Sequence, residues 1–245
     1  MAVYTIADLH LSTLASTDKS MEVFGKRWDG YTERLKNNWQ RLVGENDTVI
    51  IPGDISWALS LEEAESDMKF LNSLPGKKIL AKGNHDFWWS TMKKHENFFG
   101  KHGIDTISFL YNNAYKIENF IIAGTRGWFA DDDSKAIPDN TDYDKIVNRE
   151  CLRLKASLNE AMKLKEAYPE CEIIVFMHFP VAFADNVCQE LLDVLKAYGI
   201  KRLYYGHIHG VYTAPRCTVK DGIEMHIISA DYLDFTPLYV HKTEN

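Results

Sequence analysis

Short apolar runs alternate with helical patterns along most of this chain, and no other feature limits the fold as strongly. Runs rich in Val, Ile, Leu and Phe predict buried strands over 3–7, 48–51, 78–81, 120–123, 173–177 and 202–205. Apolar residues at helical spacing predict helices over 31–43, 60–74, 144–167 and 187–198. Ser60 and Glu63 form a candidate capping box for the second of these helices. Strands that alternate with helices are typical of an α/β fold.

The end of the chain departs from this alternation. Segments 223–229 and 237–241 have strand patterns with no helix between them, so we expect part of the sheet to be antiparallel and the sheet to be mixed. A chain of 245 residues is long enough for one large domain, and we predict a single domain over 1–245. The polar stretches 11–30 and 127–143 exceed ordinary connections, and they are either lid loops or plain surface excursions.

Hydropathy and cysteine usage limit the cellular location that we expect for the protein. No apolar run approaches the roughly 18 residues that a membrane-spanning helix needs, and the start of the chain lacks a basic stretch followed by an apolar one. We therefore expect a cytoplasmic protein with no membrane span. The cysteines contain no C-x-x-C pair, which disfavours a zinc knuckle and predicts buried, reduced thiols at Cys151, Cys171, Cys188 and Cys217.

The formal net charge of −7 disfavours general binding to duplex nucleic acid, because such binding relies on many Lys and Arg contacts to phosphates. Two bound divalent cations would nevertheless create a strongly positive spot inside an acidic protein. The expected partner is therefore a small phosphorylated substrate. The sequence does not predict the oligomeric state.

Polar clusters follow most of the predicted strands directly. They are Asp8-Leu9-His10, Gly53-Asp54, Gly83-Asn84-His85-Asp86, His178 and Gly206-His207-Ile208-His209. Loops at the carboxyl ends of strands converge on one edge of an α/β sheet, so these side chains can meet in space. Each cluster alone is a weak signal, and an isolated D-x-H is more often a turn or a surface pair. Their order and joint presence indicate a two-metal hydrolytic site.

The residue types in these clusters limit the metal. In D-x-H and H-x-H, an extended backbone sends the first and third side chains to the same side, where they can bind one ion. Glycine permits the close backbone turns that project ligands into a common pocket. A mixed Asp and His donor set favours first-row transition metals over calcium. We expect two such ions, manganese or iron first, with zinc, cobalt and nickel as alternatives.

The ordered set D-x-H, G-D, G-N-H-D, H and G-H-x-H resembles the calcineurin-like metallophosphoesterase superfamily over residues 8–209. The resemblance implies a mixed-sheet α/β/β/α sandwich with the metal site at the carboxyl ends of the strands. It also implies that one ion is bound by Asp8, His10, Asp54 and His209. The second ion would be bound by Asp54, Asn84, His178 and His207, so that Asp54 bridges both ions. His178 rests on its position after a strand more than on a motif.

One departure from the sequence pattern of the superfamily narrows the class of substrate. Protein serine/threonine phosphatases carry G-D-x-x-D-R-G, whereas Gly53-Asp54 is followed here by Ile55-Ser56-Trp57-Ala58. A phosphoprotein substrate therefore loses support. The metallo-β-lactamase signature H-x-H-x-D-H is also absent from the chain.

The expected reaction is hydrolysis of a phosphomonoester or phosphodiester. Two ions about 3.5–4 Å apart can share a hydroxide that attacks phosphorus and can hold the phosphate oxygens during in-line displacement. The resemblance implies that His85 faces the substrate and assists the leaving group as a catalytic acid. Asp86 is predicted either to orient His85 or to cap a helix. The alternative function is a non-catalytic metal-binding scaffold or partner-binding module on the same fold.

Several other residues near the clusters have two interpretations. Trp57, Trp88 and Trp89 are either pocket walls or ordinary core aromatics. Arg126 either clamps a substrate phosphate or forms an ordinary ion pair. Four histidines lie outside the clusters and are assigned packing or surface roles: His95, His102, His226 and His241.

Overall fold

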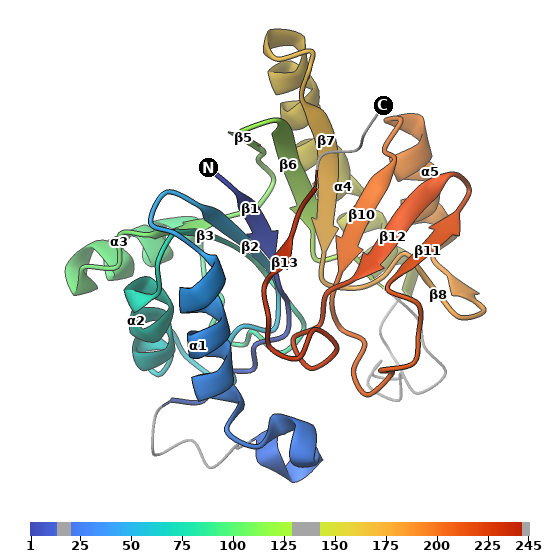
Figure 1. Ribbon diagram of the computed structural model, residues 1–245. Helices are drawn as coiled ribbons and strands as arrows, with labels where there is room; N and C mark the ends of the chain where they lie inside the picture. Colours follow the sequence, from blue (N-terminus) through green and yellow to red (C-terminus); the bar gives the residue numbers. More distant parts are fainter. Residues whose placement is uncertain (14–20, 129–142, 242–245) are drawn as a thin grey trace.

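Two β-sheets form the centre of the computed structural model, which describes residues 1–13, 21–128 and 143–241 (Figure 1). The first sheet has the strand order β13-β1-β2-β3-β4. Its strands are β1 (Val3–Thr5), β2 (Thr48–Pro52), β3 (Lys77–Ala81), β4 (Ile107–Phe109) and β13 (Leu238–Tyr239). Strands β1 to β4 are parallel, and β13 pairs with β1 in the antiparallel direction.

The second sheet has the order β11-β12-β10-β7-β6-β5. Its strands are β5 (Tyr115–Ile117), β6 (Phe120–Thr125), β7 (Glu172–Met177), β10 (Arg202–Tyr205), β11 (Cys217–Lys220) and β12 (Ile223–Ile227). The four inner strands are parallel, and the edge strands β5 and β11 are antiparallel to their neighbours. A small hairpin of β8 (Ala182–Phe183) and β9 (Asn186–Val187) lies outside both sheets.

Helices cover the outer face of each sheet (Figure 1). The first sheet is covered by α1 (Tyr31–Leu42), α2 (Glu65–Ser73) and α3 (Met92–His102), and the second by α4 (Tyr143–Ala167) and α5 (Gln189–Ala197). Two short 3₁₀ helices, η1 (Met21–Phe24) and η2 (Lys26–Trp28), precede α1. The layers are therefore α/β/β/α with mixed sheets, and the predicted fold class is confirmed.

Alternation along the central strands builds two separate cores. In β7, Ile174 and Phe176 pack into the cluster that surrounds the first sheet, while Val175 and Met177 pack into the cluster beneath α4 and α5. Successive side chains of a strand point to opposite faces, so a strand buried on both faces is apolar throughout. This is why the parallel strands read as continuous apolar runs in the sequence.

The two sheets are joined at the ends of β1 and β12. Ala7 and Ser229 form an isolated parallel bridge. The Ala7 N–H donates to the Ile228 carbonyl at 2.9 Å, and the Ala7 carbonyl accepts from the Ala230 N–H at 2.9 Å. These bonds hold the carboxyl ends of the strands of both sheets at one edge of the sandwich.

The structure corrects several sequence-based boundaries. The helix predicted over 60–74 begins at Glu65, and the Ser60–Glu63 pair instead caps the turn before it, with Glu63 N–H donating to Ser60 Oγ at 3.2 Å. Helix α3 was not predicted, because its sequence is largely polar. Cys217 is exposed, unlike the three other cysteines.

The two predicted lid loops lie partly outside the described residues, which leave out 14–20 and 129–142. The described part of the first loop contains η1 and η2 rather than irregular chain alone. In the described parts of the chain, no helix combines the length and apolar character needed to span a membrane.

Candidate metal centre

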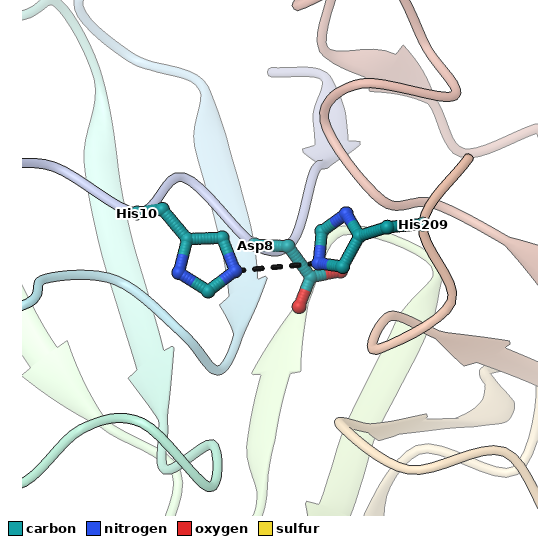
Figure 2. A group of neighbouring side chains, drawn as sticks. All are labelled: Asp8, His10 and His209. Atoms are coloured by element: carbon teal, nitrogen blue, oxygen red, sulfur yellow. Dashed lines mark hydrogen bonds between the residues drawn. The ribbon is translucent and has the colours of Figure 1, made fainter. Parts of the chain in front are cut away.

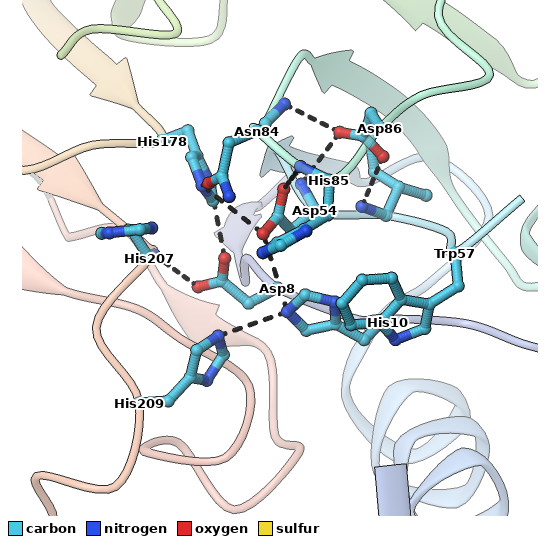
Figure 3. A network of polar contacts seen from close by, with 12 residues as sticks. Asp8, His10, Asp54, Trp57, Asn84, His85, Asp86, His178, His207 and His209 are labelled. Atoms are coloured by element: carbon cyan, nitrogen blue, oxygen red, sulfur yellow. Dashed lines mark hydrogen bonds and ion pairs between the residues drawn. The ribbon is translucent and has the colours of Figure 1, made fainter. Parts of the chain in front are cut away.

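The predicted ligands come from five loops, each at the carboxyl end of a strand: β1, β2, β3, β7 and β10. Figure 3 shows their side chains converging between the two sheets. The described residues contain two three-residue groups here whose potential ligand atoms lie within 4.8 Å of one another. These groups are Asp8, His10 and His209, and Asp8, Asp54 and His178.

The first group corresponds to the first predicted ion site. His10 and His209 come from opposite sheets, and their Nε2 atoms are 3.3 Å apart (Figure 2). The Asp8 carboxylate lies beside both rings and is completely buried. Three donors of this kind from two sheets can bind one transition-metal ion.

The second group contains the predicted bridging residue. Oδ2 of Asp54 lies 3.7 Å from Nε2 of His10 and 3.5 Å from Nε2 of His178, so it faces both predicted ion sites. Oδ1 of Asn84 is 2.5 Å from the same His178 nitrogen. Asp8 also belongs to both groups, whereas the family resemblance assigns the shared position to Asp54 alone.

His207 is the predicted ligand with the loosest connection to these groups. Its ring centroid is 5.2 Å from that of His178, and its backbone N–H donates to Oδ2 of Asp8 at 2.8 Å. Neither three-residue group includes it. Its role as a ligand therefore stays a prediction, although its ring faces the same cavity.

The backbone of the ligand loops is strained. Asp8, His10, Asp54 and His207 have positive φ angles of 59°, 44°, 49° and 69°. Residues other than glycine rarely adopt this region, and each instance costs on the order of 1–3 kcal/mol. The loops brace one another, since His10 N–H donates to the Asp54 carbonyl at 2.9 Å. Concentration of such conformations at one place is typical of functional sites.

Two glycines permit the loops to approach the carboxylates. A Cβ atom on Gly83 would collide with the carboxylate of Asp54, and one on Gly206 would collide with that of Asp8. The glycines of the G-N-H-D and G-H-x-H clusters are therefore required because they leave space for the ligands.

The buried carboxylates of the centre have little cationic charge beside them, and His209 is the histidine that supplies some of it. Burial raises the pKa of Asp8 to about 7 and that of Asp54 well above its ordinary value. The nearest rings do not compensate, because burial holds the pKa of His10 and His178 well below the usual histidine range. Buried carboxylates flanked by neutral imidazoles favour bound cations, so the donor set fits a pair of divalent metal ions.

Asp231 is a residue of the candidate centre that the sequence reasoning missed. Its buried carboxylate accepts from Nδ1 of His209 at 2.9 Å and from the Gly210 N–H at 3.0 Å. Burial alone would lower the pKa of His209, but the hydrogen bond to Asp231 and the charge of Asp8 raise it overall. A carboxylate in this position can orient a histidine so that its Nε2 is available to a metal ion. Its sequence signal is a lone acidic residue shortly after β12.

Asp86 has a different role from the two that were predicted. It caps no helix, since α3 begins at Met92 with Thr91 as its N-cap. Its buried carboxylate accepts five hydrogen bonds, which come from the backbone N–H groups of Asp54, Ile55, Ser56 and Gly83 and from Nε1 of Trp88. A carboxylate has about four lone-pair sites, so these donors fill its capacity. Asp86 therefore fixes the loops that carry Asp54 and Asn84, and this contradicts the prediction that it orients His85.

A cavity of about 350 Å³ opens beside the ligands. His10, Asp54, His85, His207 and His209 line its polar side. Its apolar side is formed by Met21, Phe24, Trp28, Trp57 and Tyr212. The volume is at the lower end of the range for small-molecule sites.

The three tryptophans beside the clusters have different environments. Trp57 stacks on His10 with ring centroids 4.8 Å apart and lies 4.6 Å from the ring of His85, so it is a wall of the cavity. Trp88 is buried in the core, and Trp89 is partly buried against Phe109. Trp28 of η2 is a further wall residue that the sequence reasoning did not identify.

Arg126 lies outside this cavity. Its guanidinium is 3.6 Å from the buried carboxylate of Glu150, which supports the ion-pair interpretation. Its carbonyl accepts from the backbone N–H groups of His178 and Phe179 at 3.2 and 2.9 Å. The backbone of Arg126 therefore helps to fix the loop that carries His178.

Comparison with known proteins agrees with this geometry. Two similar solved structures are a phosphopantetheinyl hydrolase from Mycobacterium tuberculosis and the protein TT1561 of Thermus thermophilus. The first has 14% sequence identity, covers 99% of this chain and 96% of its own, and has a TM-score of 0.54. The second has 9% identity, covers 94% and 89%, and has a TM-score of 0.54. At these identities the likeness supports the fold alone.

A search of curated protein sequences gives no match to this chain. The family model described as calcineurin-like phosphoesterase matches residues 1–211, which include every predicted ligand. Together with the α/β/β/α fold and the convergent Asp and His side chains, this match shows that the chain belongs to the calcineurin-like phosphoesterase family.

Proposed function

We propose that this protein is a binuclear-metal-dependent phosphoesterase that hydrolyses a small phosphomonoester or phosphodiester, with His85 assisting the leaving group. The observation that carries the proposal is the position of Asp54, whose Oδ2 faces His10 and His178 at 3.7 and 3.5 Å. This is the arrangement expected for a carboxylate between two ions, each bound also by imidazole from the second sheet.

The donor residues carry so little negative charge that the centre would be net positive once two divalent metals bind. Two divalent ions would activate water as the nucleophile and neutralise charge on the phosphoryl oxygens. Asp8 and Asp54 contribute the negative charge of the donor set, while the amide of Asn84 and the neutral rings of His10 and His178 contribute none. This donor set therefore leaves a positive surplus for an anionic substrate.

His85 is the group that we assign to proton transfer. It lines the cavity, and its backbone N–H donates to Oδ1 of Asp54 at 2.8 Å, which fixes its position relative to the predicted bridging carboxylate. Its ring is 5.8 Å from the His10 ring and 4.6 Å from Trp57, measured between centroids. From there it can donate a proton to the departing alkoxide.

The apolar wall of the cavity supports an ester with an apolar or aromatic alcohol portion. Trp28 and Trp57 offer flat surfaces beside the predicted ligands, and Phe24 is largely exposed at the rim. Figure 3 shows Trp57 beside His10 on the side away from His178. The phosphate would bind over the ligands, and the alcohol would pack against this wall.

The metal pair and the cellular location complete the proposal. We favour manganese or iron because mixed Asp, Asn and His donors suit these ions. We also propose a cytoplasmic location, supported by the unpaired cysteines, of which Cys151, Cys171 and Cys188 are buried.

The experiment that tests the proposal compares leaving groups in the presence of manganese. Wild-type protein should hydrolyse p-nitrophenyl phosphate and a simple alkyl phosphate, or the corresponding phosphodiesters. His85→Ala should reduce kcat on the alkyl ester by about 10²-fold or more and reduce it less on the p-nitrophenyl ester, because a poor leaving group depends more on the acid.

Metal content and a matched variant provide the controls. His85→Ala should keep wild-type metal stoichiometry by elemental analysis, since His85 is not a predicted ligand. His102→Gln, which removes a histidine paired with Glu65 on the surface of α3, should retain activity. Equal losses on both esters in His85→Ala would contradict the acid role, and no turnover of any ester by metal-loaded protein would contradict the phosphoesterase.

A further inference from the structure

A second cavity lies beside the metal centre and has the opposite charge character. It has a volume of about 290 Å³ and is lined by three cationic side chains, Lys82, Arg126 and Arg153. We call it the basic pocket. Neutral hydrogen-bonding residues complete its lining, among them Ser90, Thr91, Asn112 and Thr125.

The positive charge of the basic pocket exceeds the negative charge that contacts it. Glu150 is completely buried and is 2.7 Å from Arg153 and 3.6 Å from Arg126. The Glu150 carboxylate also accepts from Thr125 Oγ1 at 2.8 Å and from the Gly127 N–H at 3.2 Å. Glu150 is thus one carboxylate paired with two of the three cations, which leaves a surplus of positive charge in the basic pocket, although the whole chain has a net charge of −7.

Two of the cationic side chains have hydrogen-bond donors or charge without a partner among the described residues. Nε of Arg126 is buried and has no hydrogen-bond partner among the described residues. Lys82 is half-buried and forms no ion pair within the described part of the chain. Buried donors without partners are costly, so a ligand that accepts hydrogen bonds here would be bound favourably.

The basic pocket shares its supporting loops with the metal centre. Lys82 lies two residues before Asn84, at the end of β3. Arg126 follows β6, and its carbonyl accepts from the backbone N–H of His178 at 3.2 Å. The two sites therefore lie at the same edge of the sandwich and share two of its loops.

We propose that the basic pocket binds a phosphate group other than the one hydrolysed at the metal centre. Arginine guanidinium groups match the oxygens of a phosphate in a bidentate manner, and the surplus charge of the basic pocket suits a dianion. The inference rests on the proposed phosphoesterase. The bound group is either a second phosphate of the substrate or free inorganic phosphate released by the reaction.

The first experiment locates the anion. Crystals of manganese-loaded protein are soaked in tungstate, a phosphate analogue whose anomalous signal is easily located. We expect one peak at the metal centre and a second among Lys82, Arg126 and Arg153. The second peak should vanish in crystals of Arg153→Met, and its absence from wild-type crystals overturns the proposal.

The second experiment distinguishes the two sources with steady-state kinetics. Arg153→Met should raise KM about tenfold or more for an ester that carries a second phosphate, and leave KM unchanged for p-nitrophenyl phosphate, if the pocket binds substrate. If it binds free phosphate instead, Arg153→Met should remove a non-competitive component from inhibition by inorganic phosphate. Tungstate in the pocket with neither kinetic effect is an adventitious ion only and overturns the proposal.

Two further variants keep these results interpretable. Lys82→Met removes a cation without an ion pair among the described residues, and it should reproduce the effect of Arg153→Met if the latter fails to fold. Lys155→Met removes an exposed charge from the same helix as Arg153, outside the basic pocket, and should behave as wild type. Wild-type protein inert toward every ester would contradict the phosphoesterase, while the tungstate peak would still test the basic pocket.

Discussion

The metal centre and the basic pocket occupy one edge of the sandwich, yet their chemistry is opposite. The metal centre concentrates buried carboxylates among neutral imidazoles and therefore favours cations. The basic pocket surrounds one buried carboxylate with three cationic side chains and therefore favours anions. The difference teaches that local arrangement of charge, and not the net charge of −7, decides which ligand each site can hold.

The largest expected effect separates the two sites by activity. Asp54→Ala should lower kcat on p-nitrophenyl phosphate by about 10³-fold or more, because it removes the carboxylate that faces both predicted ion sites and several kcal/mol of transition-state stabilisation with it. Arg153→Met should leave this activity unchanged. The measurement is steady-state turnover with parallel elemental analysis of bound metal.

Asp105→Ala serves as the control for loss of an aspartate, since Asp105 is exposed just after the end of α3 and far in sequence from the ligands. If Asp54→Ala turned over the ester at the wild-type rate, the metal centre could not be distinguished from the basic pocket as the site of hydrolysis.

A smaller effect should result from the residue that supports His209. Asp231→Asn should weaken binding of manganese by about 10–100-fold, because loss of the carboxylate weakens the orientation and basicity of the imidazole. Titration of metal-free protein with manganese measures this change. At saturating metal, most of the activity should return.

Asp234→Asn is the matched variant, since Asp234 lies three residues further along and pairs with Arg34 at the surface. An unchanged manganese affinity in Asp231→Asn would show that His209 needs no support from this carboxylate.

The smallest expected effect concerns stability without metal. The folded protein keeps Asp8 protonated up to about pH 7, whereas in the unfolded chain it ionises near its ordinary pKa of 3.8. The unfolded state therefore binds fewer protons between these values, and Asp8 lowers stability as pH rises from about 4 to about 7. In chelator, Asp8→Asn should match the wild-type Tm at pH 3.5 and exceed it by roughly 5–10 °C at pH 8.

Differential scanning calorimetry at both pH values checks this expectation, and the histidines are common to both proteins. Added manganese should reverse the order at pH 8, because the wild type gains more from the ions than the variant does. A Tm difference that does not change with pH would mean that Asp8 carries no burial penalty.

The convergence of the candidate ligands could be predicted from the sequence because each follows a strand, and the ends of parallel strands meet in any α/β sheet. Asp8, His10, Asp54, His178 and His209 were all brought together in this way. The α/β class followed from the same alternation. What the alternation could not predict was the division of the strands into two sheets, since this depends on which apolar face packs on which neighbour.

The residues that were missed or misassigned depend on contacts distant in sequence. Asp231 pairs with His209 across the end of β12, and nothing near it in the sequence indicates that partner. Asp86 was assigned to its sequence neighbour His85, although its carboxylate accepts from Asp54, about thirty residues away. Local pattern identifies a polar residue at a loop but does not identify which donors will surround it.

The wall of the metal-centre cavity has an evolutionary consequence. Met21, Phe24 and Trp28 come from a segment of the chain that contains none of the predicted ligands, and Tyr212 follows the last of them. Most of the wall proposed to contact the alcohol is therefore encoded apart from the candidate ligands, and Trp57, in the loop after Asp54, is the exception. Randomising residues 21–28 in a laboratory library should yield descendants that prefer new alcohols while inheriting the same hydrolytic chemistry.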